Sequence, residues 1–235
     1  GRCGDGAGQA IDGNDGNDTF NIQGTTGVAN INGEAGNATF NFGSLTPTTG
    51  GNVNSIAGRV NINGGGGNNV LNVDDTGDTA ANAGYLTSTQ LTGLGLGSGV
   101  NYLAVESLNI NLGSGNDMFG VQSTNATTTT TLNTGAGSNS IIVGTLAPST
   151  GGTVNNIFGA LIIVGSGSDT LIVDDDGDTT ANSGTLTPTT ITGLGMGSGI
   201  TYTGLAPLNI SLGSGDYTFA GNDITNTTVT TIDGG

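Results

Sequence analysis

The sequence predicts an all-β protein folded as a parallel β-solenoid, a coil of short strands wound around a narrow apolar core. Three observations predict this fold. A unit of about 100 residues repeats along the chain, and a shorter motif, apolar-x-x-Gly-x-Gly-x-(Asn/Asp)-x-apolar-x-apolar with some drift, recurs seven times. Short Ile/Leu/Val/Phe runs lie between Gly-rich turns, and no segment has the apolar spacing of an amphipathic helix.

The long repeat is visible in three places. Val73–Thr79 returns as Val173–Thr179, and Leu108–Ile110 returns as Leu208–Ile210. The glycine-rich stretch 93–99 returns at 193–199. We therefore treat residues 1–235 as one continuous array, with repeat boundaries near 8–107, 108–207 and a partial 208–235. The array is expected to belong to a longer chain or assembly.

The spacing of the short motif predicts the coils. Its sixth position falls at residues 18, 38, 69, 117, 139, 169 and 217, at intervals of 20, 31, 48, 22, 30 and 48 residues. Intervals of 20 to 31 residues suit one coil. The 48-residue interval is expected to hold two coils, because it contains extra apolar runs at Tyr85–Leu91 and Val100–Val105. This gives roughly ten coils of about 24 residues each.

The strands follow from alternation of apolar and polar residues. In Leu108-Asn109-Ile110-Asn111-Leu112, apolar side chains point to one face and asparagines to the other. Glycine at each corner permits tight turns. The same strand propensity fits tandem antiparallel β-sandwich domains, which we keep as the alternative fold. The predicted strands are Phe20–Ile22, Phe40–Phe42, Val60–Ile62, Leu71–Val73, Leu108–Ile110, Ile141–Val143, Leu161–Val164 and Leu171–Val173.

The charge balance excludes some classes of partner. The chain has 18 acidic residues, two basic residues and no histidine, for a formal net charge of −16. Such a chain lacks the cations that bind nucleic acid phosphates or anionic membranes. No apolar stretch is long enough to predict a membrane-spanning helix, so membrane insertion is not expected. Self-repulsion at this charge favours association with divalent cations.

Two acidic loops are the strongest candidate metal sites. Several carboxylates within five residues, bent by a glycine, suit the oxygen coordination of Ca²⁺. The alternatives are solvated turns whose Asp side chains cap backbone amides, and a carboxylate pair of a polysaccharide hydrolase on a β-helix. The enzymatic reading is disfavoured because the cluster occurs twice and no His or Lys assists it. The candidate ligands are Asp74, Asp75 and Asp78 in the first loop and Asp174, Asp175, Asp176 and Asp178 in the second.

The short motif resembles the Gly-Gly-x-Gly-x-Asp-x-apolar-x repeat of RTX (haemolysin-type) calcium-binding proteins. The most similar copies are Gly13–Phe20, Leu112–Phe119 and Val164–Leu171. The resemblance implies a β-roll in which adjacent turns share Ca²⁺, and it nominates Asp18, Asp117 and Asp169 as ligands. The matching positions in the other copies depart from the family, since they hold Ala38, Asn69, Asn139 and Tyr217.

Over nearly its full length, the chain also resembles the Gly/Asn/Thr-rich repeats of very large bacterial surface proteins. Together these features predict a non-enzymatic, extracellular or cell-surface structural module stabilised by Ca²⁺, such as a filament subunit, surface layer or adhesin stalk. End-to-end self-association is the expected partnership, because open solenoid ends expose unpaired strand edges. A calcium-dependent adhesin that binds a glycan or a surface partner is the alternative, and a polysaccharide-degrading enzyme is the second alternative.

Overall fold

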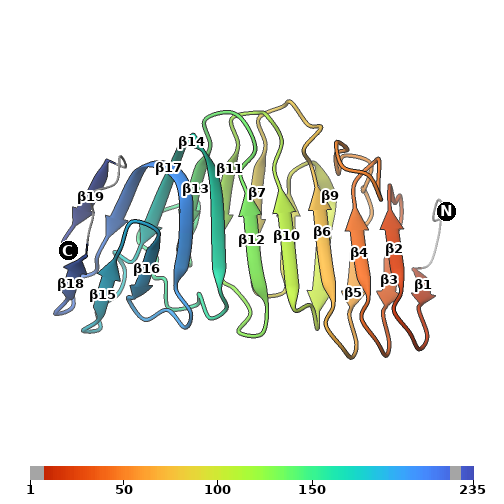
Figure 1. The fold of residues 1–235 in the computed structure, drawn as a ribbon, viewed down its shortest axis with the longest axis horizontal. Coiled ribbons are helices and arrows are strands. Elements are labelled where there is room, and N and C mark those ends of the chain that lie inside the picture. Colours follow the sequence, from red (N-terminus) through yellow and green to blue (C-terminus); the bar gives the residue numbers. More distant parts are fainter. Residues whose placement is uncertain (1–7, 223–228) are drawn as a thin grey trace.

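A computed structural model of the chain describes residues 8–222 and 229–235, so Cys3 lies outside the described residues. These residues form 19 β-strands and no helix, arranged side by side along one long axis (Figure 1). The strands form two faces that enclose a single apolar core. This confirms the predicted all-β solenoid. The alternative of antiparallel β-sandwich domains is wrong, because fourteen of the eighteen strand pairs are parallel and join one coil to the next.

Face 1 and face 2 are defined by their strand ladders, and β14 and β17 run around a corner and contribute to both. Face 1 contains, in spatial order, β1 (Gln9–Asp12), β3 (Ala29–Asn32), β5 (Val60–Asn63), β9 (Leu96–Leu103), β8 (Gln90–Gly93), β7 (Ala83–Leu86), β11 (Met118–Val121), β13 (Ser140–Val143), the end of β14 (Leu161–Asp174), the end of β17 (Ile200–Ser211) and β19 (Thr230–Asp233). Face 2 contains β2 (Thr19–Ile22), β4 (Thr39–Phe42), β6 (Val70–Asp74), β10 (Ser107–Asn111), β12 (Thr129–Asn133), the starts of β14 and β17, β16 (Thr190–Gly193), β15 (Ser183–Leu186) and β18 (Thr218–Gly221).

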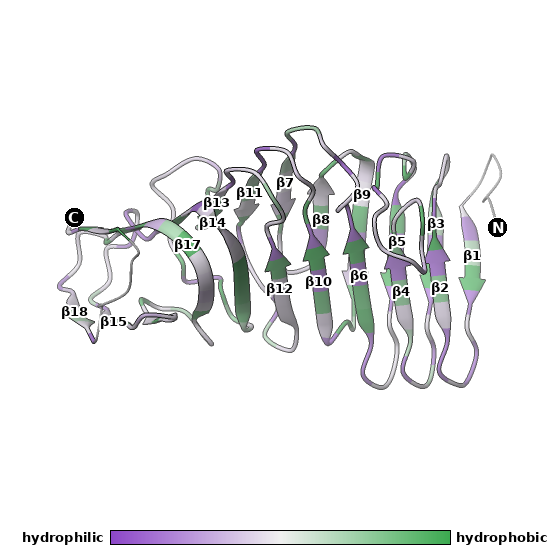
Figure 2. Cartoon of the chain, turned by 45° about the horizontal axis from the view of Figure 1, so that its top comes forward, coloured by the Kyte–Doolittle hydropathy of each residue, from purple (hydrophilic) through white to green (hydrophobic). Residues whose placement is uncertain are grey.

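Strand alternation places the core between the faces. In β4, Phe40 and Phe42 are buried, and Asn41 between them points outward. Hydropathy along the strands follows the same alternation (Figure 2). On the outer surface of face 2 the amides of Asn41, Asn72 and Asn109 each donate to the asparagine oxygen of the preceding coil, at 2.8–3.0 Å. This amide ladder ends where Thr131 takes the next position.

Glycine at the corners is required by close approach of the coils. Gly36 has φ of +117°, and a Cβ there would collide with the carbonyl oxygen of Gly16 in the coil before. Gly67 has φ of +90° and stands in the same relation to Gly36. Gly36 and Gly67 therefore lie in a column along the corner. At each of them a side chain is excluded both by the close contact and by the positive φ.

The spacing predicted two coils in the 48-residue interval, and this prediction is wrong. After β6 the chain forms β7, β8 and β9, which pair antiparallel within face 1 before the chain continues as β10 on face 2. The two apolar runs at 85–91 and 100–105 thus belong largely to an in-plane meander. Strands β15, β16 and β17 repeat this meander within face 2.

The meander changes the relation between repeats. One repeat contains six single strands, β1 to β6, and one meander, which together make seven passes across the core. Because seven is odd, the second repeat begins on the opposite face: β1 lies in face 1 and its counterpart β10 lies in face 2. We call the edge where face 1 leads into face 2 the first edge (turns 13–18, 33–38 and 64–69) and the opposite edge the second edge (turns 75–82, 112–117 and 165–169).

Candidate functional site

The nominated carboxylates lie on both edges. Asp74, Asp75 and Asp78 follow β6 on the second edge, whereas their counterparts after β14 lie on the first edge. From the 100-residue repeat alone one would expect the two acidic loops to recur along one edge of the rod. That expectation is wrong, because the odd number of passes reverses each repeat. Asp117 and Asp169 share the second edge, and Asp18 lies on the first.

The first acidic loop, residues 74–78, binds the long connection 43–59 through hydrogen bonds, and we call this arrangement a clasp. The Asp74 carboxylate accepts the Gly51 amide N–H at 3.0 Å, and the Asp75 carboxylate accepts the Val53 N–H at 3.1 Å. The side-chain amide of Asn54 donates to Asp78 at 2.9 Å. Buried backbone N–H groups need hydrogen-bond acceptors. In the strands the neighbouring strand supplies them, and in this irregular connection the carboxylates do.

The second acidic loop repeats the clasp on the other edge. Asp174 accepts the Gly152 N–H at 2.7 Å, Asp175 accepts the Val154 N–H at 3.0 Å, and Asn155 donates to Asp178 at 2.9 Å. Asp176 differs, because it is exposed and replaces Thr76, whose hydroxyl donates to Asp74 at 2.6 Å. The two acidic loops therefore share a structural role, and the second carries one more free charge.

Burial makes one carboxyl in each clasp titrate unusually. Asp75 is 1 % exposed, and burial, reinforced by the charges of Asp78, Asp117 and Asp74, raises its pKa to about 7. Burial raises the pKa of Asp175 to about 6. The Tyr217 hydroxyl, which donates to Asp175 at 3.0 Å, lowers this pKa, and the first repeat has the acidic Asp117 at the position of Tyr217.

The neighbouring Asp78 shows the opposite behaviour. The Ala80 backbone N–H and the Asn54 amide hold its pKa below the usual range, and Asn82 adds a further donor. In the second loop, the Thr180 hydroxyl and backbone N–H, with Asn155 and Asn182, lower the pKa of Asp178. Each clasp thus combines a carboxylate that is held ionised with a carboxyl that favours its proton.

Two of the residues nominated by the resemblance to RTX repeats, Asp117 and Asp169, belong to a second arrangement, which we call the corner ladder. Residues 69, 106, 117, 139 and 169 lie at corners of the coil and accept, through a side-chain oxygen, the backbone N–H of the corresponding residue one coil earlier. Asp169 and Asn69 are the most enclosed of them, each with 0 % exposure. Asp169 also accepts the Ser166 N–H and the Thr134 hydroxyl, both at 2.7 Å.

The sequence prediction missed part of this ladder. Asn69, Glu106 and Asn139 act in it beside Asp117 and Asp169, yet only the acidic copies were nominated. The available signal was the recurrence of Asn at the same motif position, since an amide oxygen accepts an N–H as a carboxylate does. Ala38 donates its N–H to Asn69 but contributes no acceptor.

Metal ligation by these residues stays a prediction. Within residues 8–222 and 229–235, no group of three or more His, Cys, Asp or Glu side chains is arranged to hold a metal ion. Asp12, Asp15 and Glu34, which the sequence prediction did not nominate, line an open acidic pocket on the first edge with Asn14. The structure therefore gathers carboxylates in several places and engages those of the clasps and the corner ladder with N–H and O–H donors.

Comparison of the chain with protein-family models, with curated proteins and with solved structures found no match. In the part of the chain that the structure describes, no helix has the length and hydrophobicity to cross a membrane.

Proposed function

We propose that this chain is a non-enzymatic structural module, a stiff spacer in a longer extracellular or cell-surface array. The observation that carries the proposal is the unbroken ladder: strands pair from β1 to β19 on face 1 and from β2 to β18 on face 2. Each repeat contacts the next through the same strand pairs, as in other solenoids. The extracellular setting rests on the acidic, Gly/Asn/Thr-rich composition and on the resemblance to bacterial surface proteins.

The hydrogen bonds of the acidic loops support a structural role for their carboxylates rather than an enzymatic one. A hydrolase needs carboxylates that converge on a substrate. In both clasps the carboxylates instead face amide donors of the adjacent connection. Stabilisation by Ca²⁺ remains part of the proposal as a prediction, because free lone pairs on these oxygens can still ligate a cation.

Spin labels at the two ends test the spacer role. We would replace Cys3 with Ser and introduce Asn14→Cys and Thr231→Cys, two exposed positions near β1 and in β19. Eleven strands in face 1, spaced by about 4.8 Å, predict one narrow distance distribution centred near about 48 Å. A broad or much shorter distribution would contradict a stiff spacer. Release of sugars from polysaccharides by the purified chain would favour the enzymatic alternative.

A further inference from the structure

The chain contains two junctions at which a new repeat stacks on a completed meander. At the first, β11 pairs with β7, and the ring of Phe119 lies against Gly84, where a Cβ would be only 2.6 Å from the ring. At the second, β18 pairs with β15, and Phe219 lies against Gly184 with a corresponding distance of 2.7 Å. Both glycines are therefore required by the phenylalanine of the following repeat.

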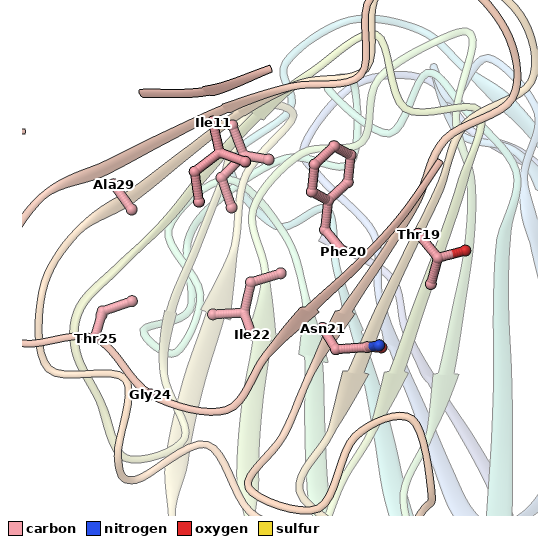
Figure 3. A pocket seen from close by; sticks show the side chains of 9 residues that line it. Ile11, Thr19, Phe20, Asn21, Ile22, Gly24, Thr25 and Ala29 are labelled. Carbon is pink, nitrogen blue, oxygen red and sulfur yellow. The ribbon is translucent and has the colours of Figure 1, made fainter. Parts of the chain in front are cut away.

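Among residues 8–222 and 229–235, the N-terminal end presents the same elements without a neighbour. Phe20 occupies the position of Phe119 and stacks on Phe40 toward the rod, with ring centroids 5.1 Å apart and planes at 7°. Beyond it lies a pocket of about 220 Å³ at the open end of the core. Figure 3 shows Ile11 from one face and Phe20 and Ile22 from the other pointing into this space, whereas Asn21 points away.

A buried polar atom marks the same end. In the corner ladder, Asp117 accepts the Asn82 backbone N–H from the preceding coil at 2.8 Å, and Asn69 accepts the Ala38 N–H in the same way. Asp18 stands at the matching position of β2. Its Oδ2 atom is buried and has no hydrogen-bond partner among the described residues. This oxygen lies beside Gly13 of its own turn, and a buried unpaired carboxylate oxygen is costly.

We propose that the N-terminal end of the rod is an acceptor surface for a preceding repeat of the same type. In that repeat, the segment that corresponds to residues 82–94 contacts the N-terminal end. The counterpart of Asn82 supplies a backbone N–H to Asp18, and the counterpart of Gly84 leaves room for the ring of Phe20. The counterpart of Leu94 closes the pocket, as Leu94 does beside Phe119. The inference rests on the proposed array function and names the partner that extends the array.

A second copy of this chain does not offer the required segment. Its residues 82–94 and 182–194 are already covered by β11 and β18. The surface at its C-terminal end consists of β18 and β19 instead. The partner that fits the N-terminal end is therefore a repeat that ends at its meander. End-to-end stacking, which the sequence predicts in general terms, then requires that unit.

The test adds one repeat to the full chain. A further copy of residues 8–106 is fused directly before Gly8, so that Glu106 of the added copy precedes Gly8 as it naturally precedes Ser107. Hydrogen exchange of the β2 amides should slow by about tenfold or more in the extended chain. Asp18→Ala should speed this exchange about tenfold in the extended chain and hardly change it in the original chain. The exposed Asp15→Ala is the matched control in both chains.

Three results would overturn the inference: unchanged β2 exchange after extension, an equal effect of Asp18→Ala in both chains, or strong β2 protection already present in the original chain. In the last case, dependence on protein concentration would identify a second copy as the occupant. Independence of concentration would identify the chain's own first residues. The spin-label distance is measured on the original chain, so a stiff rod with a failed extension would reject this inference alone.

Discussion

The covered junction at β11 and the open end at β2 contain the same residue types in different environments. Phe119 and Asp117 are buried by the meander of the preceding repeat, whereas Phe20 is partly exposed and Asp18 lacks a donor. Each repeat is thus completed by its neighbour, and the contribution of a residue to stability depends on its position in the array as much as on its identity.

The largest difference is expected for the two aromatic side chains. Phe119→Ala should lower the free energy of unfolding by about 3–5 kcal/mol, because it leaves a cavity in a packed junction. Phe20→Ala should cost about 1–2 kcal/mol, because part of that ring already faces the open pocket. Urea unfolding of the two variants measures both values. Equal losses would show that the N-terminal end is as well covered as the junction.

The corner ladder gives the next largest contrast. Asp169→Ala should cost about 2–4 kcal/mol, because it leaves the N–H groups of Asn139 and Ser166 without their acceptor in a buried site. Asp18→Ala should leave the free energy of unfolding unchanged or raise it, since no described donor is lost and a buried unpaired oxygen is removed. Asp169→Asn is the control, because its amide oxygen preserves one acceptor. A large loss at Asp18 would contradict the contrast.

The pH dependence of stability should come mainly from the clasps. The pKa values of Asp75 and Asp175, about 7 and 6, lie above their unfolded values, so the folded state holds protons that the unfolded chain releases. Stability should therefore be greatest near pH 4 and fall as the pH rises from the unfolded value of 3.8 to the folded values of about 6 and 7. Asp75→Asn should remove part of this fall and raise stability at pH 8 by about 1–3 kcal/mol.

Thermal unfolding from pH 4 to pH 8 measures this effect. Asp78→Asn is the matched control, because donors lower the pKa of Asp78 and its contribution is lost only as the pH falls below the normal carboxyl range. A stability that rises between pH 5 and pH 8, or an unchanged slope in Asp75→Asn, would argue against protonation of Asp75 in the folded state.

Calcium should have the smallest effect. The sequence predicts that Ca²⁺ raises the unfolding midpoint relative to a chelator, by mass action on the folded state. The shift should be larger at pH 8 than at pH 5, because Asp75 and Asp175 must lose their protons to ligate a cation. An identical midpoint in Ca²⁺ and in chelator at pH 8 would reject the calcium prediction for all ten nominated aspartates.

Local patterns predicted the elements well and their relation to one another less well. Alternation in segments such as Leu108–Asn111 identified the strands, and the corner glycines identified the turns. The antiparallel meander was missed because Tyr85–Leu91 and Val100–Val105 have the same β propensity whether a strand returns in plane or passes around the core. The acidic residues were found by composition, but which amides they accept depends on the connection 43–59 folding against them.

The reversal of each repeat is the central structural claim, and crosslinking tests it most directly. Ser114 lies in the first turn of the second repeat and donates its N–H to the Asp78 carbonyl oxygen at 2.8 Å, which places turns 75–82 and 112–117 together on the second edge. With Cys3 replaced by Ser, a short bismaleimide should join cysteines introduced as Thr79→Cys and Ser114→Cys, both exposed positions. The control pair, Thr79→Cys with Asp15→Cys on the first edge, should stay unlinked. Failure of the 79–114 pair to link would contradict the reversal, because repeats in one orientation place these turns on opposite edges.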